Sequence, residues 1–279
     1  MEPHPVTGQP FASPVPPGTG WPGDPATART PRAADPADVV RLARSARDLD
    51  AVSARSSVCR ACPRLVQWRE AVATTGRRAA FADQPYWGRP GAGFGDLAPS
   101  LLVVGLAPAA NGTNRTGRLF TGDRSGDWIY AALHRAGYAR VPYSRHAGDG
   151  QHLTGARIVA AVRCAPPGNR PLPAERDACA PWLDRETQLV LPTLRVVLAL
   201  GGFGFDAFLA AARRLGWGVP VPRPRFGHGV EVPLTDPTGR AVPLLASYHV
   251  SQQNTFTGRL TEPMLDAVLA RARTLAAAG

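Results

Sequence analysis

The chain has 279 residues, with 32 basic and 21 acidic side chains and a formal net charge of +11 at pH 7. Every basic residue is arginine, whose forked donors suit phosphate oxygens, although charge alone does not distinguish a nucleic-acid surface from a scattered, solvated excess. No stretch approaches the roughly 18 apolar residues of a membrane span, and no basic start precedes an apolar segment. We therefore expect a cytoplasmic protein without a membrane segment or secretory signal.

The first 35 residues differ in composition from the rest of the chain. They contain nine prolines, with Gly, Thr and Ala between them. Such a segment buries too little apolar area to offset its chain entropy. We predict a disordered tail over residues 1–35 and one globular domain over residues 36–279.

Helical and strand patterns alternate along the remainder. Asp35 and Pro36 form an N-cap and first-turn signal for a helix, and a second helix is expected at 65–72. Short apolar runs predict four buried strands, at 101–104, 158–162, 196–200 and 244–247. Amphipathic helices are expected at 126–137, 173–190, 203–215 and 261–277. This rhythm predicts an α/β fold with a mostly parallel four-stranded sheet covered on both faces.

The four cysteines form two groups. Cys59 and Cys62 have the Cys-x-x-Cys spacing of half a metal site, and Cys164 and Cys179 follow much later in the chain. Four thiolates suit one iron–sulfur cluster or one structural zinc ion. The alternative is buried free thiols. A four-sulfur site leaves no cysteine over, and a reducing cytoplasm disfavours disulfides, so we predict a metal site that joins the two segments.

Three loops rich in Gly, Pro, Asn and Arg follow predicted strands, at 105–123, 163–171 and 248–255. In a parallel sheet such loops converge beyond the carboxyl ends of the strands, where ligands bind. They suit a site that takes a small planar group while neighbouring amides hold a phosphate backbone. The run from Gly201 to Gly204 lacks the glycine spacing and the acid of a dinucleotide site, so we interpret it as a strand-to-helix turn.

The motifs in these loops resemble the uracil-DNA glycosylase superfamily, specifically its family 5, the iron–sulfur type of bacteria and archaea. The resemblance covers residues 55–275. It rests on the two cysteine pairs, Gly-Leu-Ala-Pro from Gly105, Gly-Arg-Leu-Phe-Thr-Gly-Asp from Gly117, Arg-Cys-Ala-Pro-Pro-Gly-Asn from Arg163, and the run from His249 to Thr255. It implies a three-layer αβα sandwich, a [4Fe–4S] cluster on Cys59, Cys62, Cys164 and Cys179, and a deaminated base in DNA as the substrate.

The expected chemistry needs a base flipped out of the duplex, because its glycosidic bond is inaccessible inside the stack. The resemblance implies that Phe120 stacks on uracil, and we expect His249 to donate a hydrogen bond to O2 as charge develops there. Gly105, Ala107 and Ala109 are expected to line the pocket. The alternatives for the two rings are an ordinary core phenylalanine and a surface histidine.

Two asparagines are candidates for polar roles. The turn 106–109 has no polar side chain where other branches of the superfamily orient the attacking water, and family 5 shares this absence. We expect Asn114 to position the water and Asn169 to read the uracil edge through its amide, although both are also common turn residues. Because few polar side chains are expected to line the base pocket, we predict that it accepts hypoxanthine or xanthine as well as uracil.

Further residues around these motifs are expected to contact DNA. They are Arg115, Ser251, Asn254, Thr255 and Arg259. Phe256 and Leu260 are the apolar options for a side chain that fills the gap left by the flipped base.

The sequence therefore predicts a monomeric glycosylase that hydrolyses the N-glycosidic bond of uracil in DNA and leaves an abasic site. One alternative is a non-catalytic iron–sulfur DNA-binding module, suggested by the basic charge and the missing acid. Another is a zinc-stapled nucleotide-binding protein. A third alternative is a superfamily member that forms a covalent adduct with DNA through a histidine beside a basic inserted loop. This alternative fits less well, because no Lys/Arg-rich insertion lies near His249.

Overall fold

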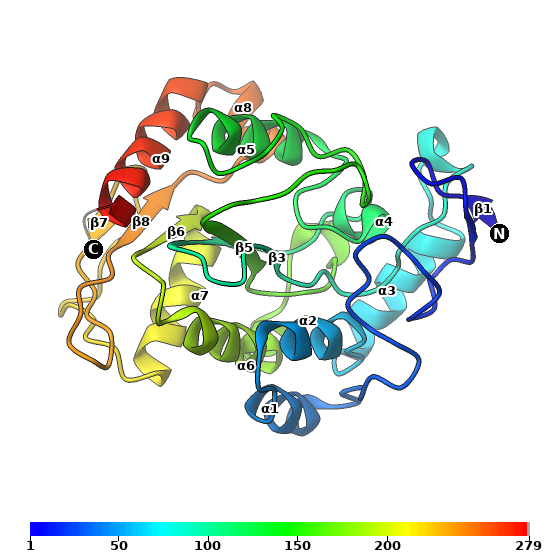
Figure 1. Ribbon diagram of the computed structural model, residues 1–279, viewed down its shortest axis with the longest axis horizontal. Coiled ribbons are helices and arrows are strands. Elements are labelled where there is room, and N and C mark those ends of the chain that lie inside the picture. Colours follow the sequence, from blue (N-terminus) through cyan, green and yellow to red (C-terminus); the bar gives the residue numbers. More distant parts are fainter. Residues whose placement is uncertain (278–279) are drawn as a thin grey trace.

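A central β-sheet organises residues 1–277, the part of the chain that the computed structural model describes (Figure 1). Its strands lie in the order β3–β5–β4–β6–β8–β7. The four inner strands are parallel, and the two edge strands are antiparallel to their neighbours. The strands are β3 (Phe94–Gly95), β4 (Leu101–Gly105), β5 (Ala156–Ala160), β6 (Val196–Leu200), β7 (Glu231–Val232) and β8 (Leu244–Ser247).

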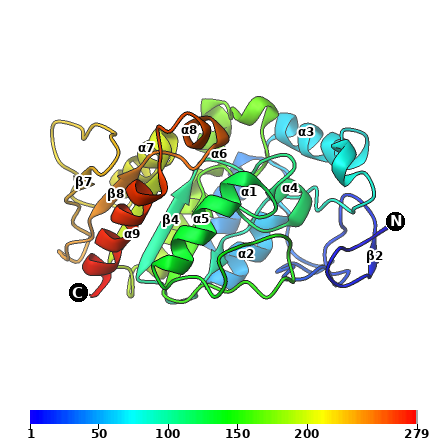
Figure 2. The ribbon, with the colours of Figure 1, turned by 90° about the horizontal axis from the view of Figure 1, so that it is seen from above.

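Two layers of helices cover the sheet (Figures 1 and 2). One face carries α5 (Arg124–Arg135), α8 (Gln252–Phe256) and α9 (Glu262–Ala277). The other carries α1 (Pro36–Arg44), α2 (Leu49–Ser57), α6 (Pro173–Val190) and α7 (Gly201–Arg214). Two further helices, α3 (Pro63–Thr74) and α4 (Thr113–Thr116), lie on the side of the molecule where the N-terminus is (Figure 1). Within residues 1–277, no helix has both the length and the apolar character needed to cross a membrane.

Alternating residues of the inner strands feed two separate cores. Leu101 and Val103 of β4 belong to the core beneath α5 and α9, whereas Leu102 and Val104 belong to the core beneath α6 and α7. Burial on both faces explains why these strands are largely apolar, with Arg157 of β5, which pairs with Glu186, as an exception. It also fixes the register of the sheet, because a slip of one residue would exchange the two cores.

The three-layer α/β fold and all four predicted strands are confirmed, but the sheet has six strands rather than four. The missed strands, β3 and β7, contain two residues each and therefore have no alternation to detect. The sequence analysis also missed α2, which is short and rich in serine, and the single-turn helices α4 and α8.

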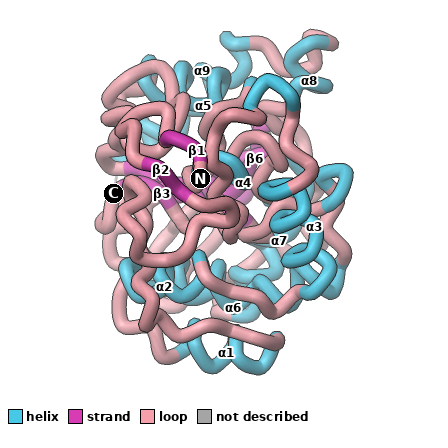
Figure 3. Tube along the Cα trace, turned by 90° about the vertical axis from the view of Figure 1, so that its right-hand side faces the viewer, coloured by secondary structure: helices cyan, strands magenta, loops and turns pink. Residues whose placement is uncertain are grey.

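Residues 1–35, expected to be disordered, instead follow a defined path over the domain (Figure 3). The strands β1 (Glu2–Pro3) and β2 (Pro10–Phe11) form a small antiparallel pair. Phe11 and Trp21 pack with Trp87 in a buried aromatic cluster. A few well-spaced aromatic side chains supply the buried area here, which a composition dominated by proline and glycine conceals.

Polar contacts also attach this segment to the domain. The indole nitrogen of Trp21 donates to the carbonyl of Thr116 in α4 at 3.2 Å. Asp24 forms a buried ion pair with Arg89 at 2.8 Å. The segment therefore braces the loops that lead toward the carboxyl ends of the inner strands.

Candidate active site and four-cysteine cavity

Phe120 and His249 lie side by side beyond the carboxyl ends of the inner strands. Phe120 is in the loop that follows β4, and His249 follows β8 directly. Their ring centroids are 6.0 Å apart and the ring planes are inclined by 37°. The structure thus brings together the two residues to which the sequence assigned stacking and leaving-group stabilisation, although they are far apart in the chain.

The backbone around Phe120 is shaped for a site. Phe120 has a φ of 51°, a left-handed conformation that costs a bulky residue on the order of 1–3 kcal/mol and that clusters at functional sites. A Cβ at Gly105 would lie 2.9 Å from the Phe120 ring, so the absence of a side chain there lets the ring cover the end of β4. Ala107 and Ala109 continue this loop as partly buried residues with small apolar side chains.

His249 is held as a neutral imidazole. Burial lowers the pKa of His249 to about 4, so the ring is uncharged at neutral pH. Asn254 donates from its side-chain nitrogen to the His249 carbonyl at 2.8 Å and fixes the backbone at the end of β8. A neutral, positioned imidazole can donate one ring N–H to an oxygen that becomes negative.

Asp123 is a carboxylate of the site that the sequence analysis did not single out. Its Oδ1 accepts from the Gly126 amide at 3.0 Å and caps α5. Its Oδ2 lies so close to Gly112 that a Cβ there would be 1.9 Å away. Burial raises the pKa of the Asp123 carboxyl, which makes it a stronger base. In the sequence, Asp123 closes the Gly-Arg-Leu-Phe-Thr-Gly-Asp motif, but the motif alone assigned it no role, and an Asp before a helix is also an ordinary N-cap.

Asn114 and Arg115 are buried rather than open to a ligand. The Asn114 side chain is fully buried and donates to the Arg69 carbonyl in α3 at 3.1 Å. The Arg115 guanidinium is 4% exposed and donates to Gln84 and to the carbonyls of Asn111 and Gly122. Their sequence-based roles, water positioning and DNA contact, remain predictions that these placements do not favour.

The other predicted contact residues lie at the surface of the same end of the sheet. Asn169 is exposed, with a φ of 56°, in a turn after β5. Ser251 precedes α8 and Thr255 lies within it, both partly buried. Arg259 is exposed, and its guanidinium lies 4.6 Å from the centroid of the Tyr248 ring. These positions are compatible with base or DNA contacts, which remain predictions.

The two apolar candidates for the wedge have opposite environments. Leu260 is fully buried in the core beneath α5 and α9, so it is not available to DNA. Phe256, the last residue of α8, is 67% exposed. The Arg124 guanidinium, which follows Asp123 in the chain, lies 5.5 Å from the centre of the Phe256 ring.

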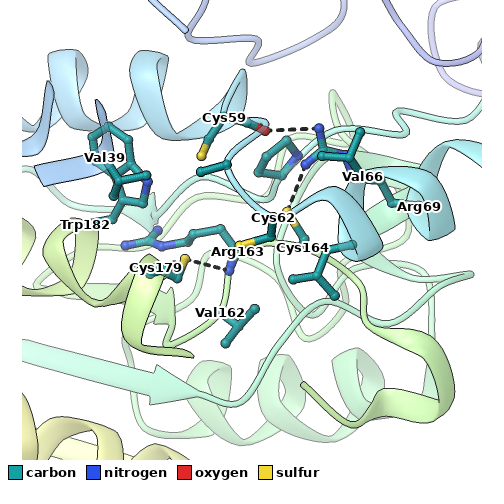
Figure 4. Close-up of a pocket in the computed structure, with 14 residues that line it drawn as sticks. Val39, Cys59, Cys62, Val66, Arg69, Val162, Arg163, Cys164, Cys179 and Trp182 are labelled. Carbon is teal, nitrogen blue, oxygen red and sulfur yellow. Dashed lines mark hydrogen bonds between the residues drawn. The ribbon is translucent and has the colours of Figure 1, made fainter. Parts of the chain in front are cut away.

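All four cysteines line one cavity on the α3 and α6 side of the sheet (Figure 4). Cys59 follows α2, Cys62 precedes α3, Cys164 follows β5, and Cys179 lies in α6. None forms a disulfide. The remaining wall is largely apolar, with Val39, Leu65, Val66, Val162 and Trp182 among its residues. The predicted convergence of the two cysteine groups is therefore seen in the fold, although the metal itself stays a prediction.

The walls of this cavity contain hydrogen-bond donors without acceptors. Arg69 Nε, Arg163 Nε and Nη1, and Trp182 Nε1 are buried and have no hydrogen-bond partner among the atoms of the described residues. Unpaired donors of this kind are rare in protein interiors. They suit an acceptor-rich, anionic group in the cavity, such as sulfide bridged to thiolates.

As free thiols, Cys59, Cys62 and Cys179 would be hard to ionise. Burial raises the pKa of Cys62 to about 12, and the neighbouring Cys164 adds to this effect. Burial likewise raises the pKa of Cys59 and of Cys179. Within residues 1–277, no set of three His, Cys, Asp or Glu side chains is gathered closely enough to hold a single metal ion. Because burial disfavours the charged form of these thiols, thiolates in this cavity would need a bound cation to be stable.

The family profile and the sequence relatives of this chain point to one family. Residues 92–273 match the profile of the Uracil DNA glycosylase superfamily. A type-5 uracil-DNA glycosylase of Mycobacterium bovis is 58% identical over 273 residues, which cover 98% of both chains. A type-5 uracil-DNA glycosylase of Thermus thermophilus is 50% identical over 82% of this chain and 99% of its own. One from Pyrobaculum aerophilum is 42% identical over 77% of this chain and 87% of its own.

Proposed function

Because this chain belongs to the uracil DNA glycosylase superfamily and is a DNA glycosylase that excises uracil in DNA repair, we propose that it does so with Phe120, His249 and Asp123. The observation that carries this assignment is the pairing of the Phe120 and His249 rings, 6.0 Å apart, beyond the carboxyl ends of the parallel strands. An aromatic face beside a neutral hydrogen-bond donor is what a flipped uracil requires.

Phe120 and His249 act on the base. The flipped uracil stacks on the Phe120 ring, which contributes on the order of 1–3 kcal/mol. The N-glycosidic bond then breaks, and its electron pair leaves with the uracil, whose O2 becomes negative. A neutral imidazole N–H of His249 donates to that oxygen, and one such donor contributes on the order of 3 kcal/mol. The lowered pKa of His249 supports this role, because the ring donates without carrying a charge in the empty pocket.

Asp123 acts on the water. Loss of the base leaves a cationic sugar carbon, and a water adds to it while giving up a proton. The Asp123 Oδ2, which is not used in capping α5, accepts that proton, and the raised pKa of Asp123 makes it a better base. We prefer Asp123 to Asn114 for this role because the Asn114 side chain is fully buried and its amide nitrogen donates to the Arg69 carbonyl.

We propose Phe256 as the side chain that fills the space left by the flipped base. Its exposed ring adjoins Arg124 and therefore the start of α5, near Asp123 and Phe120. Apolar wedges inserted between base steps offset part of the cost of unstacking. The exposed Arg259 and the residues at the start of α8 are placed to contact the DNA backbone beside it.

The range of bases extends beyond uracil in this proposal. The turn 106–109 has no polar side chain, and Asn169 at the rim is the one amide assigned to the base edge. A wrong base is rejected mainly when buried polar groups lose their partners. A pocket with few such groups should therefore also accept hypoxanthine or xanthine.

We propose that the four-cysteine cavity holds a [4Fe–4S] cluster on Cys59, Cys62, Cys164 and Cys179. The unpaired buried donors of Arg69, Arg163 and Trp182 support an anionic, sulfur-rich occupant. When bound, the cluster supplies four thiolate bonds that join the segment before α3 to β5 and α6. The protein is proposed to act as a cytoplasmic monomer on DNA.

One assay tests the activity and its assignment together. The purified protein is incubated with a duplex that contains one uracil and then treated with alkali, and strand cleavage is measured in single turnover. The wild-type protein should cleave at the uracil. The Phe120→Ala variant should cleave more slowly, by the factor in rate that corresponds to the lost stacking free energy. A wild-type protein that binds the duplex but leaves no alkali-labile site would instead indicate a non-catalytic DNA-binding module.

The cluster is tested separately. The purified protein should contain iron and absorb broadly near 400 nm, and Cys164→Ser should lose iron and thermal stability. A colourless protein that holds one zinc ion would replace the cluster with a structural zinc site, and unchanged iron and stability in Cys164→Ser would remove this cysteine from the ligands.

A further inference from the structure

Arg69 occupies a position that the proposed chemistry does not explain. It lies in α3, is 1% exposed, and lines the four-cysteine cavity (Figure 4). One guanidinium nitrogen donates to the Cys164 sulfur at 2.8 Å, and the other donates to the Cys59 carbonyl at 3.0 Å. A fully buried cation is costly unless an anion lies beside it.

Within residues 1–277, no carboxylate fills that role for Arg69. The nearest carboxylate oxygen belongs to Glu70, at 3.9 Å, and Glu70 is partly exposed and already paired with Arg60. Other charged side chains near the cavity form neutral pairs, Asp24 with Arg89 and Glu175 with Arg64. The counter-charge of Arg69 must therefore come from the cavity itself.

A second uncompensated charge lies beside Arg163, which also lines the cavity. Arg163 and Arg157 both pair with the fully buried Glu186, so two guanidinium groups share one carboxylate. The arginines hold the pKa of Glu186 below its usual value despite its burial, so it is ionised. Together with Arg69, these buried side chains carry two positive charges more than negative ones. Four thiolates around a [4Fe–4S]²⁺ core carry roughly the opposite charge, −2.

Arg69 also touches the catalytic loop. Its backbone carbonyl accepts the side-chain amide of Asn114 at 3.1 Å. Asn114 lies in α4, and the neighbouring Arg115 donates to the carbonyl of Gly122, between Phe120 and Asp123. Three hydrogen bonds, joined through the Arg69 residue and through the Asn114–Arg115 peptide, therefore connect the Cys164 sulfur to the loop that carries both of these residues.

We propose that Arg69 is the counter-cation of the four-cysteine site and the positioning residue through which that site holds the catalytic loop. This rests on the four-cysteine site of the proposed function. Loss of the Arg69 charge would make the anionic group easier to lose and harder to reduce, because each reduction adds negative charge. Loss of the Asn114 contact would release the loop without touching the site.

The test compares Arg69→Gln, Arg69→Lys and Asn114→Ala with Arg64→Gln, a control on the same helix whose ion pair lies outside the cavity wall. Each protein is purified with its bound iron. The rate of absorbance loss near 400 nm in a chelator, the reduction potential and the single-turnover excision rate are then measured.

Arg69→Gln should release iron faster by about 10- to 100-fold, the usual cost of removing an outer partner of a metal ligand, and should have a lower reduction potential. Asn114→Ala should lower the excision rate but keep the wild-type rate of iron release. Because Arg69→Gln keeps the backbone carbonyl that Asn114 contacts, the double variant should show both the faster iron release of Arg69→Gln and the slower excision of Asn114→Ala.

Arg69→Lys covers the case in which Arg69→Gln does not fold. It keeps the charge but cannot donate to Cys164 and Cys59 together, so it should release iron at an intermediate rate. If whichever Arg69 variant folds matches Arg64→Gln in iron release and potential, Arg69 is not the counter-cation. A wild-type protein without bound metal would contradict the four-cysteine site itself, which separates the two failures.

Discussion

His249 has a role that depends on staying uncharged. We expect His249→Ala to lower the single-turnover rate by about a hundredfold or more, because an interaction made with the developing oxyanion acts on rate. DNA affinity should change little, since the donor contributes mainly after the bond begins to break. Exposed His152 provides the control, as His152→Ala. Equal losses of rate and affinity would show that His249 holds the DNA or the fold instead.

The pH dependence of the rate follows from the same residue. The folded-state pKa of His249 is lowered to about 4, so the neutral donor is present throughout the range from pH 8 to pH 5. The contribution of His249 to the excision rate should therefore be constant over that range and change only near pH 4. A His249-dependent inflection near pH 6.5, seen by comparing wild type with His249→Ala, would mean that the ring is not desolvated.

Asp123 is the residue that sequence reasoning could not assign. Asp123→Asn should lower the excision rate by about 10²- to 10⁴-fold, the usual contribution of a general base. Asparagine caps a helix as well as aspartate does, so the thermal midpoint should change little. A loss of thermal stability in proportion to the loss of excision rate would show that Asp123 acts only as the N-cap of α5. The sequence placed Asp123 at the end of a motif but could not assign its role, because its contact with Gly112 depends on the folded path of the loop.

At the scale of the elements, the sequence predicted what is repeated and missed what is short. The four inner strands were found because burial on both faces leaves continuous apolar runs, and α6 and α9 were found from their length. The edge strands β3 and β7 and the helices α4 and α8 are fixed by neighbours rather than by their own patterns. The site residues on α4 and α8 could be named from sequence motifs, but the motifs could not predict whether each side chain is exposed or buried.

Helix α8 illustrates this difference and supplies a prediction. Phe256 and Leu260 were equivalent in the sequence, but only Phe256 is exposed. Phe256→Ala should slow excision from duplex DNA more than from single-stranded DNA, because only the duplex must be unstacked. Val221→Ala, at an exposed apolar residue of another loop, is the control. Equal effects on the two substrates would assign Phe256 to strand binding rather than to base flipping.

At the scale of the whole molecule, the N-terminal segment makes stability depend on pH. His4 and His146 are buried with their ring centroids 4.3 Å apart. Burial lowers the pKa of His146 to about 3 and that of His4 in the same direction. The unfolded chain therefore binds protons first as the pH falls below about 6.5, so stability is complete above that value and is lost below it.

This dependence can be measured by unfolding in denaturant. Each such histidine should reduce the free energy of unfolding by up to about 1.4 kcal/mol per pH unit as the pH is lowered from 6.5 toward the folded-state pKa. His228 and His249 act in the same direction, so the test is the difference between wild type and His146→Phe. Parallel stability curves for the two proteins would show that His146 is not buried by the N-terminal segment in solution.

The four-cysteine cavity also sets an order of events during synthesis. Cys62 and Cys164 are separated by about a hundred residues, which include β4 and α5, and the last thiol lies inside α6. Closing so long a loop carries a large entropy cost until β4 and β5 pair. The N-terminal thiols therefore leave the ribosome well before Cys164 and Cys179, and the proposed cluster can be completed only after β3, β4 and β5 have been synthesised.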